Sequence, residues 1–595
     1  MEGTPDRGFR LGDCRVEPAE LQISGARGPE HVEPRVMDVL MTLVAYAGQT
    51  VPREEIINRV WATTYIGDEV LSRCISLLRR HLGDSARKPR FIETVPKKGY
   101  RLIAPVRDGA ANNGERALRQ RRDDRHRAIA VLPFVNLSDD PEYEYFSDGM
   151  AEELLTLLAK ISGLKVAART SAFYFKDKNV DIRVIGEQLG VGAVLMGSVR
   201  HTGNQIRVSA QLIDAASGYH LWSDIYEKAV ADFFELQVEI SGAIVAALRS
   251  AMTSRDGELA ARREHEASTS DFKAYQLYLQ GKYLFNRRGE KPIRKSIELF
   301  EAACARDPRF PHARVALAKA YAVLPFYSGE PRQQAFDLAR ESACRAIELD
   351  EDIGEAHTVL GLIDMHLWRW DAAERAFLEA LAHHLNDPSL HQWYGQFLSM
   401  VGALDRSLEQ ILIAYDLDPV SPAVNERLGF TYLQLGKNEL ADHQFQVAAA
   451  LGFERSAIVD PYLLILCRMR RFSEMEHVLE NIQAKLEIEG DWARRIVRAF
   501  EKSDERDAIL RSLMTTQLRR GLPVIFAASM VLGAVEVSYE TLDVLTKSRN
   551  LNVEMLLLPE AEGIRRDARF GDLIRRVGLY DYWEATSWPE ILAAR

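Results

Sequence analysis

The stretch DEVLSRCISLLRRHLGD at residues 68–84, followed by RKPRFIETVPKKGYRL at residues 87–102, decides the fold of the N-terminal part of the chain. In the first stretch, apolar residues recur at the spacing of a core-facing helix: Leu71, Cys74, Ile75, Leu78 and Leu82. Polar and basic residues occupy the opposite side of this helix: Ser72, Arg73, Ser76, Arg79 and Arg80. The second stretch predicts two strands joined by a turn that carries Lys97 and Lys98. Together they predict a basic helix and a lysine-tipped hairpin.

Two further helices are predicted upstream of the basic helix. The amphipathic pattern from Pro34 ends at Gly48, and Pro52 precedes a second helix with acidic residues in its first turn. This order of elements is that of a winged helix–turn–helix. A helix about 10–12 Å across fits the roughly 12 Å major groove of DNA, with the hairpin beside the adjacent minor groove. The alternative is that the basic residues only keep this helix face solvated. That alternative does not explain why a hairpin follows the helix and why an apolar stripe lies opposite the basic residues.

The blocks VWATTYIGDEVLSRCISLLRRHLGD and RKPRFIETVPKKGYRL resemble the DNA-binding domain of OmpR/PhoB-type regulators. The resemblance covers residues 9–106 and is closer still to the CadC-like and invasion-activator branch, which carries this domain at its N-terminus. It implies that the third helix enters the major groove, that the wing touches the minor groove, and that Gly99 and Tyr100 shape the wing. By matching position, it implies recognition-helix contacts at Ser72, Arg73, Ser76, Arg79 and Arg80 and wing contacts at Lys97 and Lys98. Arg53 at the start of the second helix and Arg101 beside Tyr100 are further predicted phosphate contacts.

Length and composition predict a chain of several domains. At about 100–200 residues per domain, 595 residues predict three to five domains of a multidomain α+β protein. The predicted parts are a winged helix–turn–helix domain at 1–107, a charged flexible linker at 108–127, a small α/β domain at 128–252, an all-α repeat array at 268–455 and a degenerate helical region at 456–595. The linker is predicted because its composition is highly charged and poor in large apolar residues.

The charge is distributed unevenly along the chain. The whole chain holds 76 Lys and Arg against 86 Asp and Glu, whereas residues 67–101 hold nine basic and four acidic residues. One polyanion-binding end on an otherwise acidic protein explains this pattern.

Five scattered cysteines without a CxxC pair favour a reducing compartment and no zinc site. With neither a signal peptide nor an apolar run of about 20 residues, we expect a cytoplasmic protein that does not bind membranes.

The middle of the chain mixes strands and helices. IAVLPF predicts a buried strand, and the helix DGMAEELLTLLAKI is predicted to have Ser147 or Asp148 as its N-cap. RVSAQLIDA and YHLWSDIYEKA predict paired strands joined by a turn at residues 216–218. These residues, with LGVGAVLMGSVR, resemble the TolB N-terminal-like domain of bacterial regulators that also carry tetratricopeptide (TPR) arrays. The resemblance implies an α/β fold without an assigned chemistry.

The second half of the chain has a measurable repeat. Gly361, Gly395 and Gly429 are 34 residues apart, and a large apolar residue follows each glycine after 16 residues: Phe377, Ile411 and Phe445. This period is the signature of TPR repeats, and we count five units followed by degenerate ones. Such repeats stack into a superhelix with a concave groove for a peptide or protein, although the array can also serve only to dimerise or space the chain.

The leading hypothesis from the sequence is a cytoplasmic, sequence-specific DNA-binding transcription regulator. Its partners would be double-stranded promoter DNA and a second copy of itself on DNA, with RNA polymerase and a peptide in the TPR groove as candidates. In this hypothesis the TolB-like and TPR body receives a protein or oligomerisation signal. The alternative is a TPR scaffold whose winged helix contacts protein. A third class is an enzyme, because TolB-like and TPR modules also accompany nucleotide cyclases. We expect no enzyme, cofactor or metal, since no cyclase, kinase, P-loop, HExxH or nucleophile-elbow pattern is present.

Overall fold

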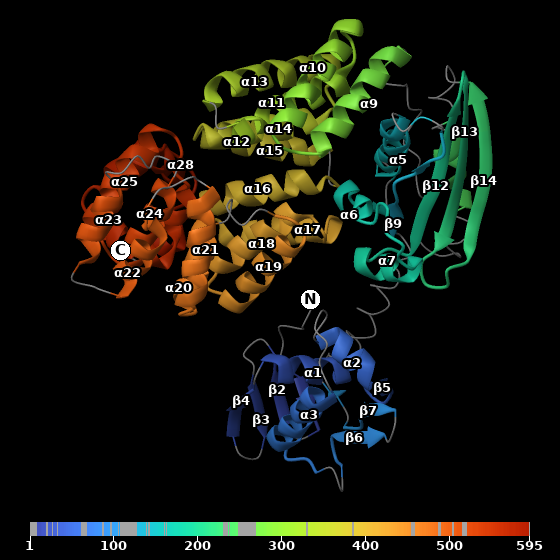
Figure 1. Ribbon diagram of the computed structural model, residues 1–595. Helices are drawn as coiled ribbons and strands as arrows, with labels where there is room; N and C mark the ends of the chain where they lie inside the picture. The colour runs from blue at the N-terminus through green and yellow to red at the C-terminus, as the bar shows by residue number, and fades with distance from the viewer. Residues whose placement is uncertain are drawn as a thin grey trace. The chain divides into compact units, whose positions relative to one another are not determined.

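The computed structural model separates the chain into two compact units, Met1–His126 and Arg127–Arg595, which are described one at a time (Figure 1). The residues that the structure describes are 9–12, 14–18, 22–25, 28–32, 34–60, 68–85, 89–95, 98–104, 106–107, 128–138, 140, 143–159, 161, 164–229, 236, 239–244, 246–247, 269, 271–328, 331–383, 386–453, 459–485, 490–501, 505–514 and 521–593. The linker predicted at 108–127 lies outside the described residues.

The first unit packs three helices between two antiparallel sheets. The N-terminal sheet has the order β4-β3-β2-β1-β8: β1 (Phe9–Leu11), β2 (Cys14–Glu17), β3 (Gln22–Gly25), β4 (Gly28–His31) and β8 (Val106–Arg107). The second sheet has the order β5-β7-β6: β5 (Thr50–Pro52), β6 (Ile92–Val95) and β7 (Gly99–Leu102). The helices are α1 (Pro34–Ala45), α2 (Arg53–Val60) and α3 (Asp68–Leu82). The apolar stripe predicted on the third helix is buried in the core of this unit, which confirms the winged helix–turn–helix order.

The second unit begins with a mixed sheet covered by helices on both faces. Its elements are β9 (Ala128–Val131), β10 (Val135–Asn136), α5 (Glu144–Ala159), β11 (Lys165–Val166), α6 (Arg169–Phe173), α7 (Ile182–Leu189), β12 (Ala193–Thr202), β13 (Gln205–Asp214) and β14 (His220–Ala229). The strand order is β11-β9-β12-β13-β14, with β9 parallel to both of its neighbours and the last three strands antiparallel. The helix α5 packs on one face of the sheet, whereas α6 and α7 contribute to a separate core on the other face.

The predicted N-cap of the first helix in this region is wrong. The helix α5 begins at Glu144, so Ser147 and Asp148 lie inside it. Both carboxylate oxygens of Asp148 accept hydrogen bonds from Lys176 Nζ at 2.7 Å, and the same ammonium pairs with Glu144 at 2.6 Å. The cap was predicted because local sequence places Ser and Asp before an apolar run. A lysine from a distant segment instead occupies the carboxylate.

Five pairs of antiparallel helices follow and confirm the repeat. They are α9 (Phe272–Asn286) with α10 (Glu290–Arg306), α11 (Pro311–Val323) with α13 (Arg332–Leu349), α14 (Gly354–His366) with α15 (Trp370–His383), α16 (Pro388–Met400) with α17 (Leu404–Leu417), and α18 (Pro422–Gln434) with α19 (Asn438–Ala450). The short helix α12 (Pro325–Ser328) is inserted within the second pair.

The repeating glycines are places where two helices of one pair come close together. A Cβ atom added to Gly361 would lie 2.7 Å from the ring of Phe377, and one added to Gly429 would lie 2.9 Å from Phe445. A Cβ at Gly281 would lie 2.5 Å from Phe300. A Cβ at Gly395 would lie 2.5 Å from the side chain of Ile411, so the 34-residue period reflects close packing of a large apolar side chain against a bare backbone. Sequence analysis missed Gly281 because a longer connection changes its spacing to the phenylalanine.

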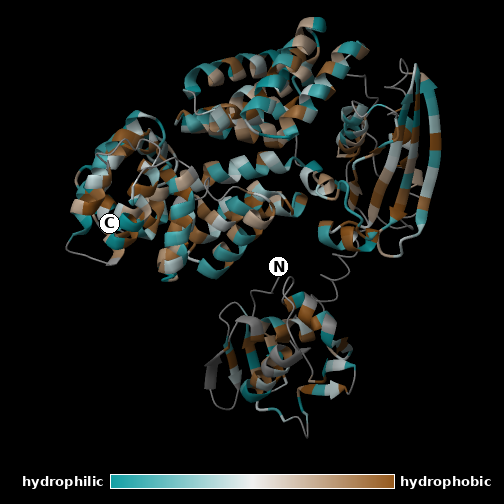
Figure 2. Cartoon of the chain, viewed as in Figure 1, coloured by the Kyte–Doolittle hydropathy of each residue, from teal (hydrophilic) through white to brown (hydrophobic). Residues whose placement is uncertain are grey.

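The chain ends in a further helical region that packs back onto the repeats. Its elements are α20 (Val459–Arg468), α21 (Phe472–Lys485), α22 (Trp492–Glu501), α23 (Arg506–Met514), α24 (Leu522–Val531), α25 (Val535–Lys547), the 3₁₀ segments η4 (Val553–Leu557) and η5 (Pro559–Ala561), α26 (Glu562–Arg566), α27 (Phe570–Arg576), α28 (Leu579–Ala585) and α29 (Glu590–Ala593). Trp370 Nε1 donates to the carbonyl of Val577 at 2.7 Å, and Trp583 Nε1 donates to that of Val401 at 3.0 Å. Hydrophobic residues lie mainly on helix sides that face other helices (Figure 2).

The apolar helix α24 is buried in the core of the second unit. Among the residues that the structure describes, no helix combines the length and the hydrophobicity that crossing a membrane requires.

Candidate nucleic-acid interface

The helix α3 presents a polar face opposite its buried stripe. Ser76 and Arg80 are exposed on this face, and Ser72 is half-buried. Ser76 Oγ donates a hydrogen bond to the carbonyl of Ser72 at 2.8 Å. Within the described part of the chain, the Arg80 guanidinium has neither an ion pair nor a hydrogen bond. Its donors are therefore available to an acceptor outside the protein. The side chain of Arg73 lies outside the described residues.

Arg79 instead connects the helix α3 to the hairpin. Its Nη2 donates to the carbonyl of Ile92 and to Thr94 Oγ1, both at 2.9 Å, and both acceptors belong to β6. The side chain is half-buried. These bonds fix the distance between the helix and the wing, so the structure gives Arg79 a positioning role. Its predicted contact with DNA stays a prediction.

Asp84 organises the turn between α3 and the hairpin, a role that sequence analysis missed. Its Oδ1 accepts hydrogen bonds from the backbone N–H groups of Ser85 at 2.9 Å and Arg90 at 2.6 Å. Its Oδ2 accepts from Phe91 at 3.2 Å and Ile92 at 2.8 Å. One carboxylate thereby holds the start of β6 in place. The only sequence signal was the Gly-Asp pair after the helix, which indicates a turn but not these partners.

The hairpin of β6 and β7 carries two of the predicted cations among the described residues. Lys98 is exposed at the tip, and its N–H donates to the carbonyl of Val95 at 3.1 Å. Arg101 lies opposite Glu93 in the ladder and pairs with it at 3.0 Å, with both side chains partly exposed. Lys97 lies outside the described residues. The wing therefore offers Lys98 directly, whereas Arg101 is already paired within the hairpin.

A close backbone contact joins the wing to the start of α2. A Cβ atom added to Gly99 would lie 1.9 Å from the carbonyl oxygen of Val51, so the pairing of β5 with β7 requires glycine there. Tyr100 is buried beside it, and the Arg53 guanidinium carbon lies 5.3 Å from the centre of its ring. This pairing brings the predicted phosphate contact Arg53 next to the wing. Cations from α2, α3 and the hairpin thus belong to one small domain.

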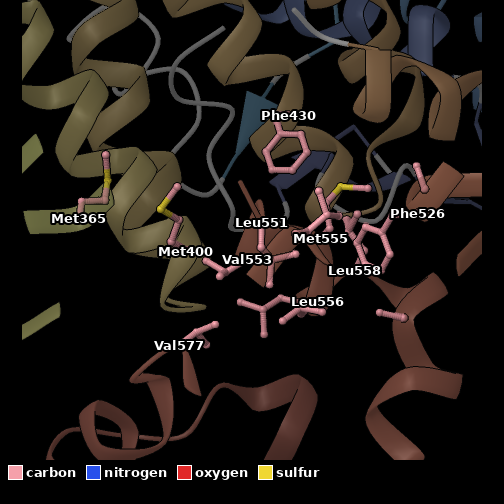
Figure 3. Close-up of a cluster of buried hydrophobic side chains, with 14 of the residues drawn as sticks. Met365, Met400, Phe430, Phe526, Leu551, Val553, Met555, Leu556, Leu558 and Val577 are labelled. Atoms are coloured by element: carbon pink, nitrogen blue, oxygen red, sulfur yellow. The ribbon is translucent and has the colours of Figure 1, made fainter. Parts of the chain in front are cut away.

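A groove of the TPR array is the second predicted binding surface, and a segment of the same chain contacts the repeat helices α16 and α18. Val553 and Leu556 belong to the same buried cluster as Met400 of α16 and Phe430 of α18 (Figure 3). The fully buried carboxylate of Glu554 completes the contact. The segment Val553–Leu557 is therefore anchored on the repeat helices by both apolar and polar contacts.

The partners of Glu554 are polar groups of the repeat helices. Arg427 Nη1 donates to both of its carboxylate oxygens, at 2.8 and 3.0 Å, and Ser399 Oγ donates at 2.5 Å. The neighbouring glutamate raises the pKa of Arg427 despite the opposing effect of burial. A charged pair so fully removed from water requires this geometry to offset its loss of hydration.

A second contact joins the mixed sheet region to the array through Asp418. Its Oδ1 accepts a hydrogen bond from Ser171 Oγ at 2.5 Å, and the N–H of Ala168 donates to the carbonyl of Leu417 at 2.9 Å. Burial raises the pKa of Asp418 to about 6, although hydrogen bonds from Ser171 and its neighbours act in the opposite direction. The folded protein therefore binds this proton more tightly than an unfolded chain does, for which the pKa is about 3.9.

Replacing Asp418 with asparagine should stabilise the second unit at pH 7.5 by up to about 3 kcal/mol, because a buried charge is removed while the shape is kept. The raised pKa lowers stability only at pH values where the folded carboxyl ionises. The stability gained by the asparagine variant should therefore fall to roughly half at pH 5. Urea unfolding of both proteins at the two pH values measures it. A difference that grows as the pH falls would contradict the assignment.

Comparison with known proteins agrees with this geometry. The family described as "Transcriptional regulatory protein, C terminal" matches residues 28–102, which include the three helices and the hairpin. The transcriptional activator CadC of Escherichia coli (strain K12) is 37% identical over 98 residues, 16% of this chain and 19% of that protein. The transcriptional regulator HilA of Salmonella typhimurium is 24% identical over 414 residues, 68% of this chain and 70% of that protein.

A relative of another kind is "Putative adenylate cyclase 3" of Rhizobium meliloti (strain 1021). It is 36% identical over 254 residues, and the chain spans only 42% of its length. The CadC match extends over 98 residues, which is the size of one small domain. The family match at residues 28–102 lies within the winged helix–turn–helix. The N-terminal domain of this chain is therefore a member of the OmpR/PhoB-type family of transcriptional regulatory DNA-binding domains.

Proposed function

We propose that the chain is a transcription regulator that binds promoter DNA sequence-specifically, with α3 in the major groove and the wing on the adjacent minor groove or backbone. The observation that carries the proposal is the exposed polar face of α3, where Arg80 has no partner among the described residues. An arginine there can donate two parallel hydrogen bonds to the O6 and N7 atoms of guanine. The predicted contacts of Arg53, Ser72, Arg73, Lys97 and Arg101 belong to the same proposal.

Affinity and specificity should come from different side chains. Phosphate neutralisation by the cations of the wing contributes affinity for any duplex and weakens steeply with salt. Base contacts from α3 contribute discrimination, about 1–3 kcal/mol for each good bidentate pair. A winged helix that docks on a protein would show neither salt-dependent affinity for duplex DNA nor a preference among DNA sequences. This difference separates the proposal from the scaffold alternative.

Replacing Arg80 with alanine should therefore relax sequence preference, lowering affinity for the selected duplex by about 10–100-fold and for random duplex much less. Replacing Lys98 with alanine should weaken both duplexes alike, by a factor of a few, and reduce the salt slope by about one. Fluorescence anisotropy of full-length protein at several salt concentrations measures both effects.

Arg183 supplies a matched control, because it is an exposed arginine in the second unit. Arg183→Ala should bind both duplexes like the parent protein. Equal losses on selected and random duplex for Arg80→Ala would contradict base readout by α3. Binding that is insensitive to salt in all three variants would favour the scaffold alternative.

We propose further that the second unit receives the signal, as a TolB-like and TPR body in a cytoplasmic protein. Its close contacts between the mixed sheet region and the repeats favour a body that responds as one piece. We assign the chain no catalytic step, and its resemblance to the protein named as a cyclase extends over less than half of that protein. RNA polymerase and a second copy on DNA remain part of the proposed partners.

A further inference from the structure

The strand β14 lies at the edge of the mixed sheet (Figure 1). Nine of its ten residues pair with β13, Leu221 being left out at a shift of register, and among the described residues no strand pairs with its other side. An open edge of this length presents N–H and C=O groups outside the ladder, of which the N–H of Ile225 donates to the carboxylate of Asp224 at 2.8 Å. Proteins usually protect such an edge with proline, charged side chains, a bulge or a covering element. β14 contains no proline, and its one irregularity in pairing lies near its beginning.

The two faces of β14 differ. Tyr226 is buried, and Trp222 packs against the same core beneath the sheet. Leu221 and Ile225 alternate with these residues and are exposed by 37% and 53%. Because side chains alternate along a strand, Ile225 lies on the outer face, opposite to Tyr226 and Trp222. An open backbone edge is thus combined with apolar side chains in water.

We infer that β14 is the surface through which two copies of this chain pair, edge to edge and antiparallel, into one continuous sheet. A two-fold axis perpendicular to the sheet preserves the faces, so one residue of β14 must lie opposite itself. With Ile225 on the axis, the regular segment Trp222–Lys228 of each copy is paired. The two exposed isoleucines then cover one another.

The charges of β14 select this register. With Ile225 on the axis, Asp224 lies opposite Tyr226 of the second copy, and Glu227 lies opposite Ser223 of the second copy. Lys228, which pairs with Glu239 at 3.3 Å within its own copy, lies opposite Trp222 of the second copy. A shift of the axis by one residue, to Asp224, would place two carboxylates opposite each other and shorten the regular overlap. Self-complementarity therefore favours a second copy over an unrelated strand.

The proposed function includes a homo-oligomer, and β14 would be its pairing surface. Pairing of two copies is measured without DNA. Failure to pair and failure to bind DNA are thus separate results. Sedimentation of the full chain should show a concentration-dependent dimer. Ile225→Lys should raise its dissociation constant about tenfold or more, because it places two ammonium groups together on the axis. Leu378→Lys, at a side chain exposed by 49% on α15, should leave the dimer unchanged.

Disulfide cross-linking tests the register in a background where the exposed Cys344 is replaced by serine. Opposite residues of an antiparallel pair have Cα atoms about 4.5–5.5 Å apart, within the range that a disulfide spans. Under mild oxidation, Ile225→Cys should form covalent dimers, and Ser223→Cys should form few because its two copies lie off the axis. A monomeric full chain, equal cross-linking of both variants, or equal weakening by Leu378→Lys would overturn the inference.

Discussion

Replacing Glu554 with alanine is expected to lower the free energy of unfolding of the second unit by about 3–5 kcal/mol, one of the largest effects of any single substitution in the chain. The carboxylate is fully buried and accepts hydrogen bonds from Arg427 and Ser399. Its removal leaves the guanidinium of Arg427 in the interior without its main counter-charge. The cavity left by the side chain adds to the loss.

Two comparisons make this prediction specific to the buried pair. The double variant Arg427→Met with Glu554→Leu should recover most of the lost stability, because no unpaired charge remains. Glu298→Ala removes the exposed pair of Glu298 with Lys295 on α10 and should cost about 1 kcal/mol or less. Urea unfolding followed by circular dichroism measures all three. If Glu554→Ala cost no more than Glu298→Ala, the segment Val553–Leu557 would not be anchored as described.

Replacing Gly99 with alanine is expected to disrupt the wing and abolish specific DNA binding. The added Cβ would lie 1.9 Å from the carbonyl oxygen of Val51, and a backbone atom cannot move aside as a flexible side chain can. The strands β5 and β7 must therefore separate, at a cost of about 3 kcal/mol or more to the first unit. Arg53 and Lys98 would lose their fixed positions relative to α3.

The matched control is Gly242→Ala in the second unit, where a Cβ atom meets nothing within 4 Å. This variant should melt and bind DNA like the parent chain. Thermal unfolding and fluorescence anisotropy on the selected duplex measure both variants. Specific binding by Gly99→Ala at parental affinity would contradict the role given to the wing.

Much of the fold follows from periodic patterns that local packing imposes. The stripe of α3 and the spacing of Gly361 from Phe377 each record one face of a helix against one neighbour, so the sequence alone predicts them. The error at Ser147 and Asp148 shows the limit of that reasoning, since Lys176 pairs with the carboxylate from another segment. Capping preferences describe only neighbours in sequence.

In the candidate site, too, local patterns predict some residues and tertiary contacts determine the others. Spacing alone places Ser76 and Arg80 on the exposed face of α3, and the structure agrees. Spacing also places Arg79 there, but its bonds to Ile92 and Thr94 depend on how the hairpin folds back on the helix. The contact of Glu554 with Arg427 joins segments 127 residues apart and follows no repeat. Such contacts depend on tertiary geometry, which a local pattern does not contain.

The most direct test of the central claim is selection of bound sequences from a random duplex library, with full-length protein and residues 1–107 in parallel. The account predicts an enriched motif with full-length protein that disappears for Arg80→Ala, together with binding that falls steeply with salt. Enrichment by residues 1–107 would place readout in the winged helix–turn–helix alone, and enrichment only by the full chain would show that pairing of two copies is required. No enrichment with either protein and no salt-sensitive binding would contradict the account.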